Sequence, residues 1–134
     1  MSYDKLVPAA TPDTEPYWDG LRLGKLMLQC CGDCRTVRHY PRPVCDRCWS
    51  MNTDWIEASG QGSVHSWTIT HYAFHPGYKN ELPFILLTVD LPEGVRMNAQ
   101  ARGIEAGSLA VGLKVRIGFE VATETLTLPV FEPA

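Results

Sequence analysis

Two Cys-x-x-Cys pairs constrain this chain more than any other feature of its sequence. The stretch CGDCRTVRHYPRPVCDRC places Cys31 and Cys34 in the first pair and Cys45 and Cys48 in the second, with ten residues between the pairs. A Cys-x-x-Cys turn points both sulfurs to one side, and two such turns brought face to face supply four thiolates at the ~2.3 Å and tetrahedral angles that Zn²⁺ accepts. The spacing therefore predicts a zinc ribbon with a closed, structural metal site.

Other uses of paired cysteines fit the sequence less well. A thioredoxin-type redox pair needs one Cys-x-x-Cys at a strand-to-helix junction, whereas Pro41 and Pro43 keep the segment between these two pairs extended. Disulfides suit an oxidising compartment, but the opening residues MSYDK do not start a signal peptide, so we expect a cytoplasmic chain with reduced thiols. Four thiolates also suit iron, and the sequence leaves that metal open. Cys30 falls outside the spacing, and we expect it to be a small buried residue on the preceding strand.

Length and charge narrow the class of protein. With 134 residues the chain can bury one good core. A net charge of −3 gives no electrostatic footprint for nucleic acid or for an anionic membrane. No apolar run approaches the ~20 residues that span a bilayer, so no membrane contact is expected.

The region before the cysteines predicts an arm and one short helix. Residues 1–13 show no periodic apolar pattern, and the segment EPYWDGLRLG then predicts a helix of about two turns that starts near Thr14. Tyr17 and Trp18 give this small helix a large apolar surface, which either packs on the chain's own ribbon or anchors a partner chain. KLMLQC is the strand expected to lead into the first cysteine pair. Trp49 and Trp55 bracket a polar turn and are expected to cover the metal.

The second half of the chain predicts five strands. They are expected at residues 63–74, 84–91, 95–104, 113–122 and 125–133, and Pro129 favours an edge position for the last strand. A long first strand, short strands after it and turns of Pro and Gly indicate a partly open Greek-key barrel of the OB type. The predicted organisation is mostly β: an arm and helix at 1–24, a zinc ribbon at 25–58 and a five-stranded OB-fold barrel at 59–134.

No catalytic residue can be named from the sequence. It contains no phosphate-binding glycine loop and no Gly-x-Ser-x-Gly motif, and His71 and His75 lie in a β pattern that does not make them a helical metal pair. A ribbon joined to an OB barrel also suits single-stranded nucleic acid, and several aromatic residues of the barrel half could stack on bases. However, residues 60–134 carry five basic and seven acidic side chains, a net charge of −2, which disfavours this alternative.

The order of motifs resembles a known family. The motifs follow one another in the order EPYWDGL, the four cysteines with Tyr40-Pro41-Arg42-Pro43, LPFILLTVDLPEGVRM, VGLKVRIGFE and LPVFEP. With this order of motifs, residues 14–133 resemble the acyl-CoA-associated family once known as domain of unknown function thirty-five. That family has a rubredoxin-like zinc ribbon followed by an OB-fold. One departure is Arg35, which stands where a glycine usually follows the second cysteine.

The resemblance implies a partner protein. Stand-alone members of the family serve thiolase-like subunits, among them aldolases that shorten steroid-like side chains as CoA thioesters, and related thiolases and acyltransferases. It implies a non-catalytic accessory subunit that helps to form the partner's acyl-CoA site. The residues expected to contact the partner or CoA are Tyr17, Trp18, Tyr40, Arg42 and Trp49. Arg35, Arg38, Arg42 and Arg47 form a cluster for CoA phosphates or an acidic partner face, or else a solvated loop.

Overall fold

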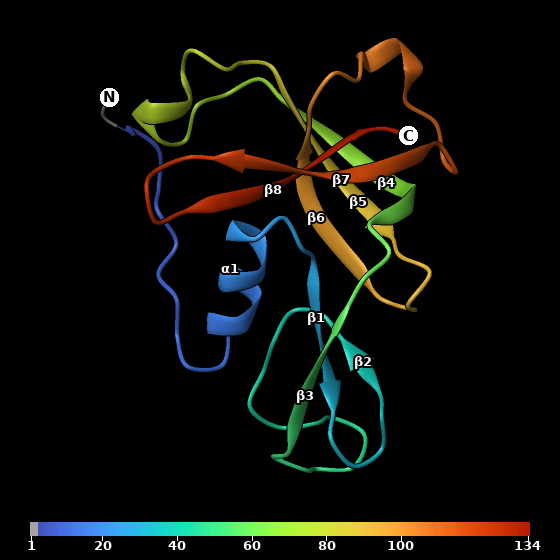
Figure 1. The fold of residues 1–134 in the computed structure, drawn as a ribbon. Helices are drawn as coiled ribbons and strands as arrows, with labels where there is room; N and C mark the ends of the chain where they lie inside the picture. Colours follow the sequence, from blue (N-terminus) through green and yellow to red (C-terminus); the bar gives the residue numbers. More distant parts are fainter. Residues whose placement is uncertain (1–2) are drawn as a thin grey trace.

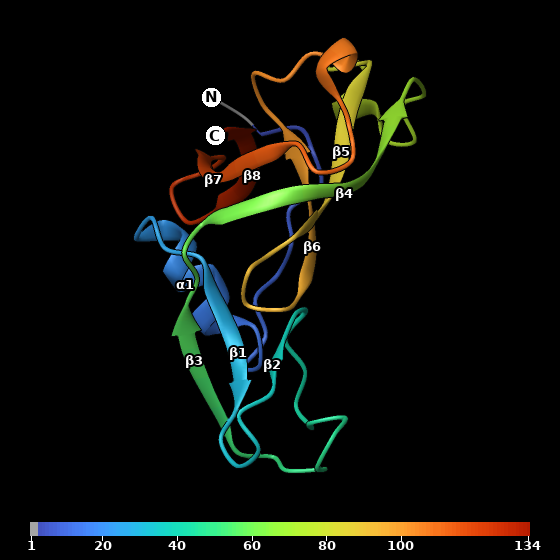
Figure 2. The same ribbon diagram turned by 90° about the vertical axis from the view of Figure 1, so that its right-hand side faces the viewer.

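The fold is a ribbon and a barrel joined by one extended segment (Figures 1 and 2). The computed structural model describes residues 3–134. Its helices and strands are α1 (Glu15–Arg22), β1 (Met27–Cys31), β2 (Val37–Arg38), β3 (Thr53–Glu57), β4 (Gln61–Thr70), η1 (Pro76–Tyr78), β5 (Phe84–Asp90), β6 (Arg96–Ala101), η2 (Ala106–Ser108), β7 (Lys114–Val121) and β8 (Thr127–Pro133).

The ribbon is a three-stranded antiparallel sheet with β1 in the middle. β2 pairs with β1 through Gln29 and Cys30, and β3 pairs along the whole length of β1. Strand β3 was not predicted, because its sequence TDWIE reads as part of a polar turn. It forms because its backbone completes the hydrogen bonding of β1, whose side chains from Leu28 to Cys31 are buried.

The five strands form a barrel in the order β4-β5-β6-β8-β7, which confirms the five-stranded OB-type prediction. The barrel is closed, whereas a partly open one was predicted. The long first strand is irregular near its start, since the register of β4 against β5 shifts between Val64 and Ser66. β4 ends at Thr70, so residues 71–74, predicted as strand, belong to the loop before η1.

The weakest part of the barrel is the seam between β6 and β8. These strands run parallel and pair at only two positions, Gln100 with Val130 and Ala101 with Phe131. Pro129 pairs with Phe119 of β7 and makes no pair with β6. β8 is therefore not an edge strand as predicted, but its proline does lie where one side of the strand is unpaired.

One hydrophobic core runs through helix, ribbon and barrel. Helix α1 packs against β1, β7 and β8, and Leu21 of the helix is 1% exposed. The same cluster of buried side chains includes Leu28 of β1 and continues to Val115 and Phe131 in the barrel. The ribbon is thus fixed to the barrel by apolar packing. None of the helices within residues 3–134 has the length and hydropathy needed to span a bilayer.

Candidate metal centre and the surface around it

The four predicted ligand cysteines meet at one point. The Sγ atoms of Cys31, Cys34, Cys45 and Cys48 all lie within 4.8 Å of one another, the one such group of metal-ligating side chains in residues 3–134. The Sγ atoms of Cys31 and Cys48 are 3.5 Å apart, and those of Cys34 and Cys45 are 3.7 Å apart. A tetrahedron with Zn–S bonds of ~2.3 Å has sulfur–sulfur edges of ~3.8 Å, whereas a disulfide needs ~2.05 Å. The geometry fits a four-thiolate metal site and does not fit disulfides.

The backbone around each cysteine pair is shaped to hold thiolates. The backbone N–H groups of Asp33 and Cys34 each donate to Sγ of Cys31 at 3.4 Å, and that of Arg47 donates to Sγ of Cys45 at 3.4 Å. The residue after each pair has a left-handed backbone, with φ 64° at both Arg35 and Trp49. Because glycine adopts this conformation without strain, the geometry explains why glycine is usual where this chain has Arg35.

The thiols differ in their readiness to ionise. The backbone N–H groups of Cys34 and Asp33 lower the pKa of Cys31 to about 6. The Thr36 hydroxyl lowers the pKa of Cys34. The backbone N–H of Ser50 lowers the pKa of Cys48, but its neighbouring thiols outweigh this and raise the value to about 12. Four sulfurs this close cannot all ionise unless a cation balances the like charges, so the arrangement calls for a metal ion.

Polar contacts fasten the two cysteine pairs to each other. The Asp33 carboxylate accepts hydrogen bonds from the Ser50 hydroxyl and, at 3.1 Å, from the Asn52 side-chain amide. These bonds lower the pKa of Asp33 and keep it charged. Cys31 and Cys45 are buried, but Cys34 and Cys48 are exposed. Trp49 is 79% exposed, so the prediction that it covers the metal is wrong.

The fifth cysteine lies apart from the metal ligands. Cys30 is 2% exposed on β1, which confirms that it is a buried strand residue. Its thiol donates to the backbone carbonyl of Arg35 at 3.5 Å. It therefore acts as a local packing and hydrogen-bonding group.

The residues predicted to contact a partner or CoA occupy different environments. Tyr17 is 6% exposed, and its ring meets Trp18 edge-on at 5.0 Å. Burial raises the pKa of Tyr17. Trp18 is half-buried against the core, while Tyr40, Arg42 and Trp49 are exposed. Tyr40 and Arg42 lie on the loop between the cysteine pairs, and Trp49 follows the second pair. Contact of these three residues with a partner stays a prediction.

Tyr40 also has a role that the sequence did not reveal. Its hydroxyl accepts a hydrogen bond of 3.1 Å from the backbone N–H of Asn98, which lies on β6 beside the unpaired part of the seam. The phenol thus joins the ribbon to the barrel across 58 positions of sequence. No local pattern signals such a long-range contact.

The predicted arginine cluster does not form as one group. Arg38 is 3% exposed, with Nε 2.5 Å from the Gln29 side-chain oxygen and Nη2 donating to the backbone carbonyl of Arg42 at 3.2 Å. Arg35 pairs with Asp54 at 2.5 Å. Arg38 therefore supports the ribbon from within, and Arg42 and Arg47 stay on the surface.

Family models match both halves of the chain. A rubredoxin-like zinc ribbon domain of ChsH2 matches residues 18–54, and the C-terminal OB-fold domain of ChsH2 matches residues 55–120. A solved structure described as "Ltp2-ChsH2(DUF35) aldolase" superposes with a TM-score of 0.86 at 35% identity, over 95% of this chain and 98% of that one.

Longer proteins also contain this unit. The chain is 35% identical over 127 residues to a "Probable enoyl-CoA hydratase alpha subunit" of Thermomonospora curvata, and 34% identical over 109 residues to the "3-oxo-4,17-pregnadiene-20-carboxyl-CoA hydratase alpha subunit" of Mycobacterium tuberculosis. These matches cover 95% and 81% of this chain, but only 39% and 34% of those proteins. The chain spans about a third of the length of these relatives and aligns end to end with the solved ChsH2(DUF35) chain. It belongs to the ChsH2 (DUF35) family of zinc-ribbon and OB-fold proteins.

Proposed function

We propose that this chain is a non-catalytic accessory subunit of a thiolase-like aldolase that acts on steroid-like CoA thioesters. Its role is to bind the thiolase-like subunit and to help form that subunit's acyl-CoA site. The reaction favoured is retro-aldol cleavage of the side chain, with a related thiolase or acyltransferase reaction as the wider class.

The observation that carries the proposal is the end-to-end match to the ChsH2(DUF35) chain of a solved two-component aldolase. Relatives named as alpha subunits of CoA-thioester hydratases, one of them for a pregnadiene carboxyl-CoA, support the substrate class. The remaining subunit would supply the catalytic side chains.

The metal in this proposal is Zn²⁺, held by the four cysteines as a structural ion. The four cysteine sulfurs would fill all four positions of a tetrahedral ion and would leave no open coordination site for a substrate. The ion would supply the charge that keeps the four thiolates together. The proposed units are residues 1–24, 25–58 and 59–134, with the metal stabilising the middle one.

We assign the exposed side chains of Tyr40, Arg42 and Trp49 on the ribbon to contact with the partner or with CoA. Trp49 is 79% and Tyr40 is 50% exposed, and large aromatic side chains near an arginine are typical of interface anchors. Trp18, half-buried on α1, is assigned to the same contact. Tyr17 would act from beneath it, because the side chain is buried.

Co-expression with a thiolase-like subunit tests the proposal. We expect the two chains to co-purify and retro-aldol cleavage of a steroid-like CoA thioester to need both. Separate elution together with cleavage that does not depend on this chain would reject it. The nucleic-acid alternative is tested by measuring the binding of single-stranded oligonucleotides at low salt. We expect no binding.

A further inference from the structure

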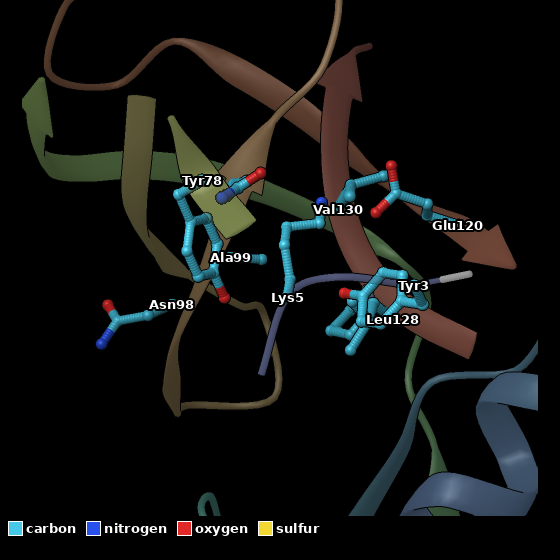
Figure 3. Close-up of a pocket in the computed structure, with 10 residues that line it drawn as sticks. Tyr3, Lys5, Tyr78, Asn98, Ala99, Glu120, Leu128 and Val130 are labelled. Atoms are coloured by element: carbon cyan, nitrogen blue, oxygen red, sulfur yellow. The ribbon is translucent and has the colours of Figure 1, made fainter. Parts of the chain in front are cut away.

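The N-terminal arm is fastened over the barrel. Lys5 Nζ lies 2.9 Å from the Glu81 carboxylate, and 5.4 Å and 5.8 Å from the ring centres of Tyr3 and Tyr78. Tyr3 and Lys5 help to line a hollow of about 190 Å³ above the β6–β8 seam, where Lys5 reaches between the two rings (Figure 3). A Cβ on Gly77 would lie 2.2 Å from the backbone oxygen of Asp4, so only glycine lets the arm pass so close to η1. The arm and the β4–β5 loop are packed as one piece.

A charged network ties this loop to the barrel as well. Arg102 lies 2.9 Å from the Glu120 carboxylate and 3.7 Å from that of Glu81, and it donates to the Gln100 side-chain oxygen at 2.8 Å. Lys5 completes the row with its bond to Glu81. The order Lys5, Glu81, Arg102, Glu120 alternates positive and negative charges. These ion pairs hold the arm, the β4–β5 loop and strand β7 in one arrangement.

Beside this network the arm and the loop enclose an apolar pocket. We call it the aromatic end: its volume is about 240 Å³, and it is lined by Leu6, Tyr72, Phe74, His75, Tyr78 and Phe84. Phe74 is 87% exposed and Tyr72 is 67% exposed, and their rings meet edge-on at 4.8 Å. Burial would be favourable for both rings, so this surface is suited to a contact that the isolated chain lacks.

Size and charge decide what the aromatic end accepts. Pockets for drug-sized ligands usually measure about 300–1,000 Å³, so this one suits a single side chain better than a CoA thioester. Within residues 3–134, no Lys, Arg, Asp or Glu lines it, which disfavours phosphate groups and anionic lipids. Tyr72 and Phe74 together expose roughly 300 Å², more than a third of the ~800 Å² that one partner contributes to a standard interface. These are properties of an interface core, where an aromatic or aliphatic side chain of another protein fills a preformed pocket.

We propose that the aromatic end is a second docking surface for the thiolase-like subunit, in addition to the ribbon, and that it receives an apolar side chain of that subunit. This inference rests on the proposed function. It adds a named surface at the opposite end of the molecule from the cysteines and makes the arm part of the binding site (Figure 1). The arm holds the β4–β5 loop in the binding conformation before the partner arrives, which lowers the entropic cost of docking.

The test is the affinity of the purified chain for the thiolase-like subunit, measured by titration calorimetry. We expect Phe74→Ser and Leu6→Ser each to raise the Kd about tenfold or more, since each removes apolar surface from the pocket. Lys5→Glu should raise it too, because repulsion from Glu81 releases the arm. Val111→Ser is the matched control for the apolar substitutions: Val111 is 74% exposed in another loop, and its substitution should leave the Kd within twofold.

The outcomes separate this inference from the proposed function. Unchanged Kd for Phe74→Ser, with normal binding by the unaltered chain, would overturn the docking surface and leave the subunit role intact. No binding by the unaltered chain would reject the subunit role itself. Light scattering of the isolated chain tests whether a second copy of this chain occupies the surface instead. The proposal would be overturned if the chain were a dimer that Phe74→Ser converts to a monomer with no change in affinity for the thiolase-like subunit. Metal content and thermal midpoint confirm that each variant is folded.

Discussion

Leu28→Ala tests whether the ribbon and barrel fold as one unit. Leu28 is 0% exposed on β1, where it belongs to the buried cluster that runs from α1 into the barrel. Truncating a buried leucine to alanine removes its transfer free energy and leaves a cavity, at a cost of about 3 kcal/mol. For a chain of this length such a loss lowers the thermal midpoint by about 10–15 °C. Leu23→Ala, at a side chain that is 73% exposed, is the control and should cost less than about 0.5 kcal/mol.

The assay is hydrogen exchange read by region together with urea unfolding. Because the core is continuous, Leu28→Ala should speed exchange in β1 and β3 and equally in the slowest amides of β5 and β7. The unfolding transition should stay single and move to lower urea. Barrel amides that keep their original protection while those of the ribbon lose it would show two independent units and refute the argument from the shared core.

Three other changes test separate parts of the structure. Cys45→Ser should reduce bound zinc from about one per chain to nearly none by mass spectrometry, while Cys30→Ser should retain it; a coloured protein with stoichiometric iron would contradict the assignment of zinc. Burial lowers the pKa of His39 to about 4. As the pH falls below 6.5, the unfolded chain therefore binds a proton at His39 that the folded chain does not bind. By pH 4 this difference lowers the free energy of unfolding by about 3 kcal/mol. His39→Phe should remove that part of the pH dependence, and identical pH profiles for both chains would refute it. Gly62→Ala should lower the free energy of unfolding in urea by about 1–3 kcal/mol, because the added Cβ would lie 2.4 Å from Cγ1 of Val89. Gly107→Ala is the control and should not destabilise the chain, because the space around Gly107 is open. Equal costs for the two substitutions would rule out the clash.

The metal site could be predicted because its information is local. Each Cys-x-x-Cys pair sets the direction of two sulfurs within four residues, and the ten residues between the pairs suffice to bring the second to the first. The barrel strands could also be predicted, because runs of strand-forming residues are separated by turns and loops rich in Pro and Gly. The helix was expected at the right place for a similar reason, and α1 indeed runs from Glu15 to Arg22.

The errors arose where distant contacts decide the structure. Strand β3 exists because β1 needs a second partner, and its own sequence gives little sign of it. The hydrogen bond from Asn98 to Tyr40 and the packing of Asp4 on Gly77 both join parts of the chain more than fifty residues apart. Pattern and spacing carry no information about such pairs.

The central claim is that this chain works as one subunit of a two-component CoA-thioester aldolase, and it meets its most direct test in light scattering on the co-expressed pair. We predict a single eluting species whose mass contains both this chain and the thiolase-like protein. Mixing the separately purified chains should restore retro-aldol cleavage that neither shows alone. Two separate peaks, with full cleavage activity in the thiolase-like peak, would contradict the claim.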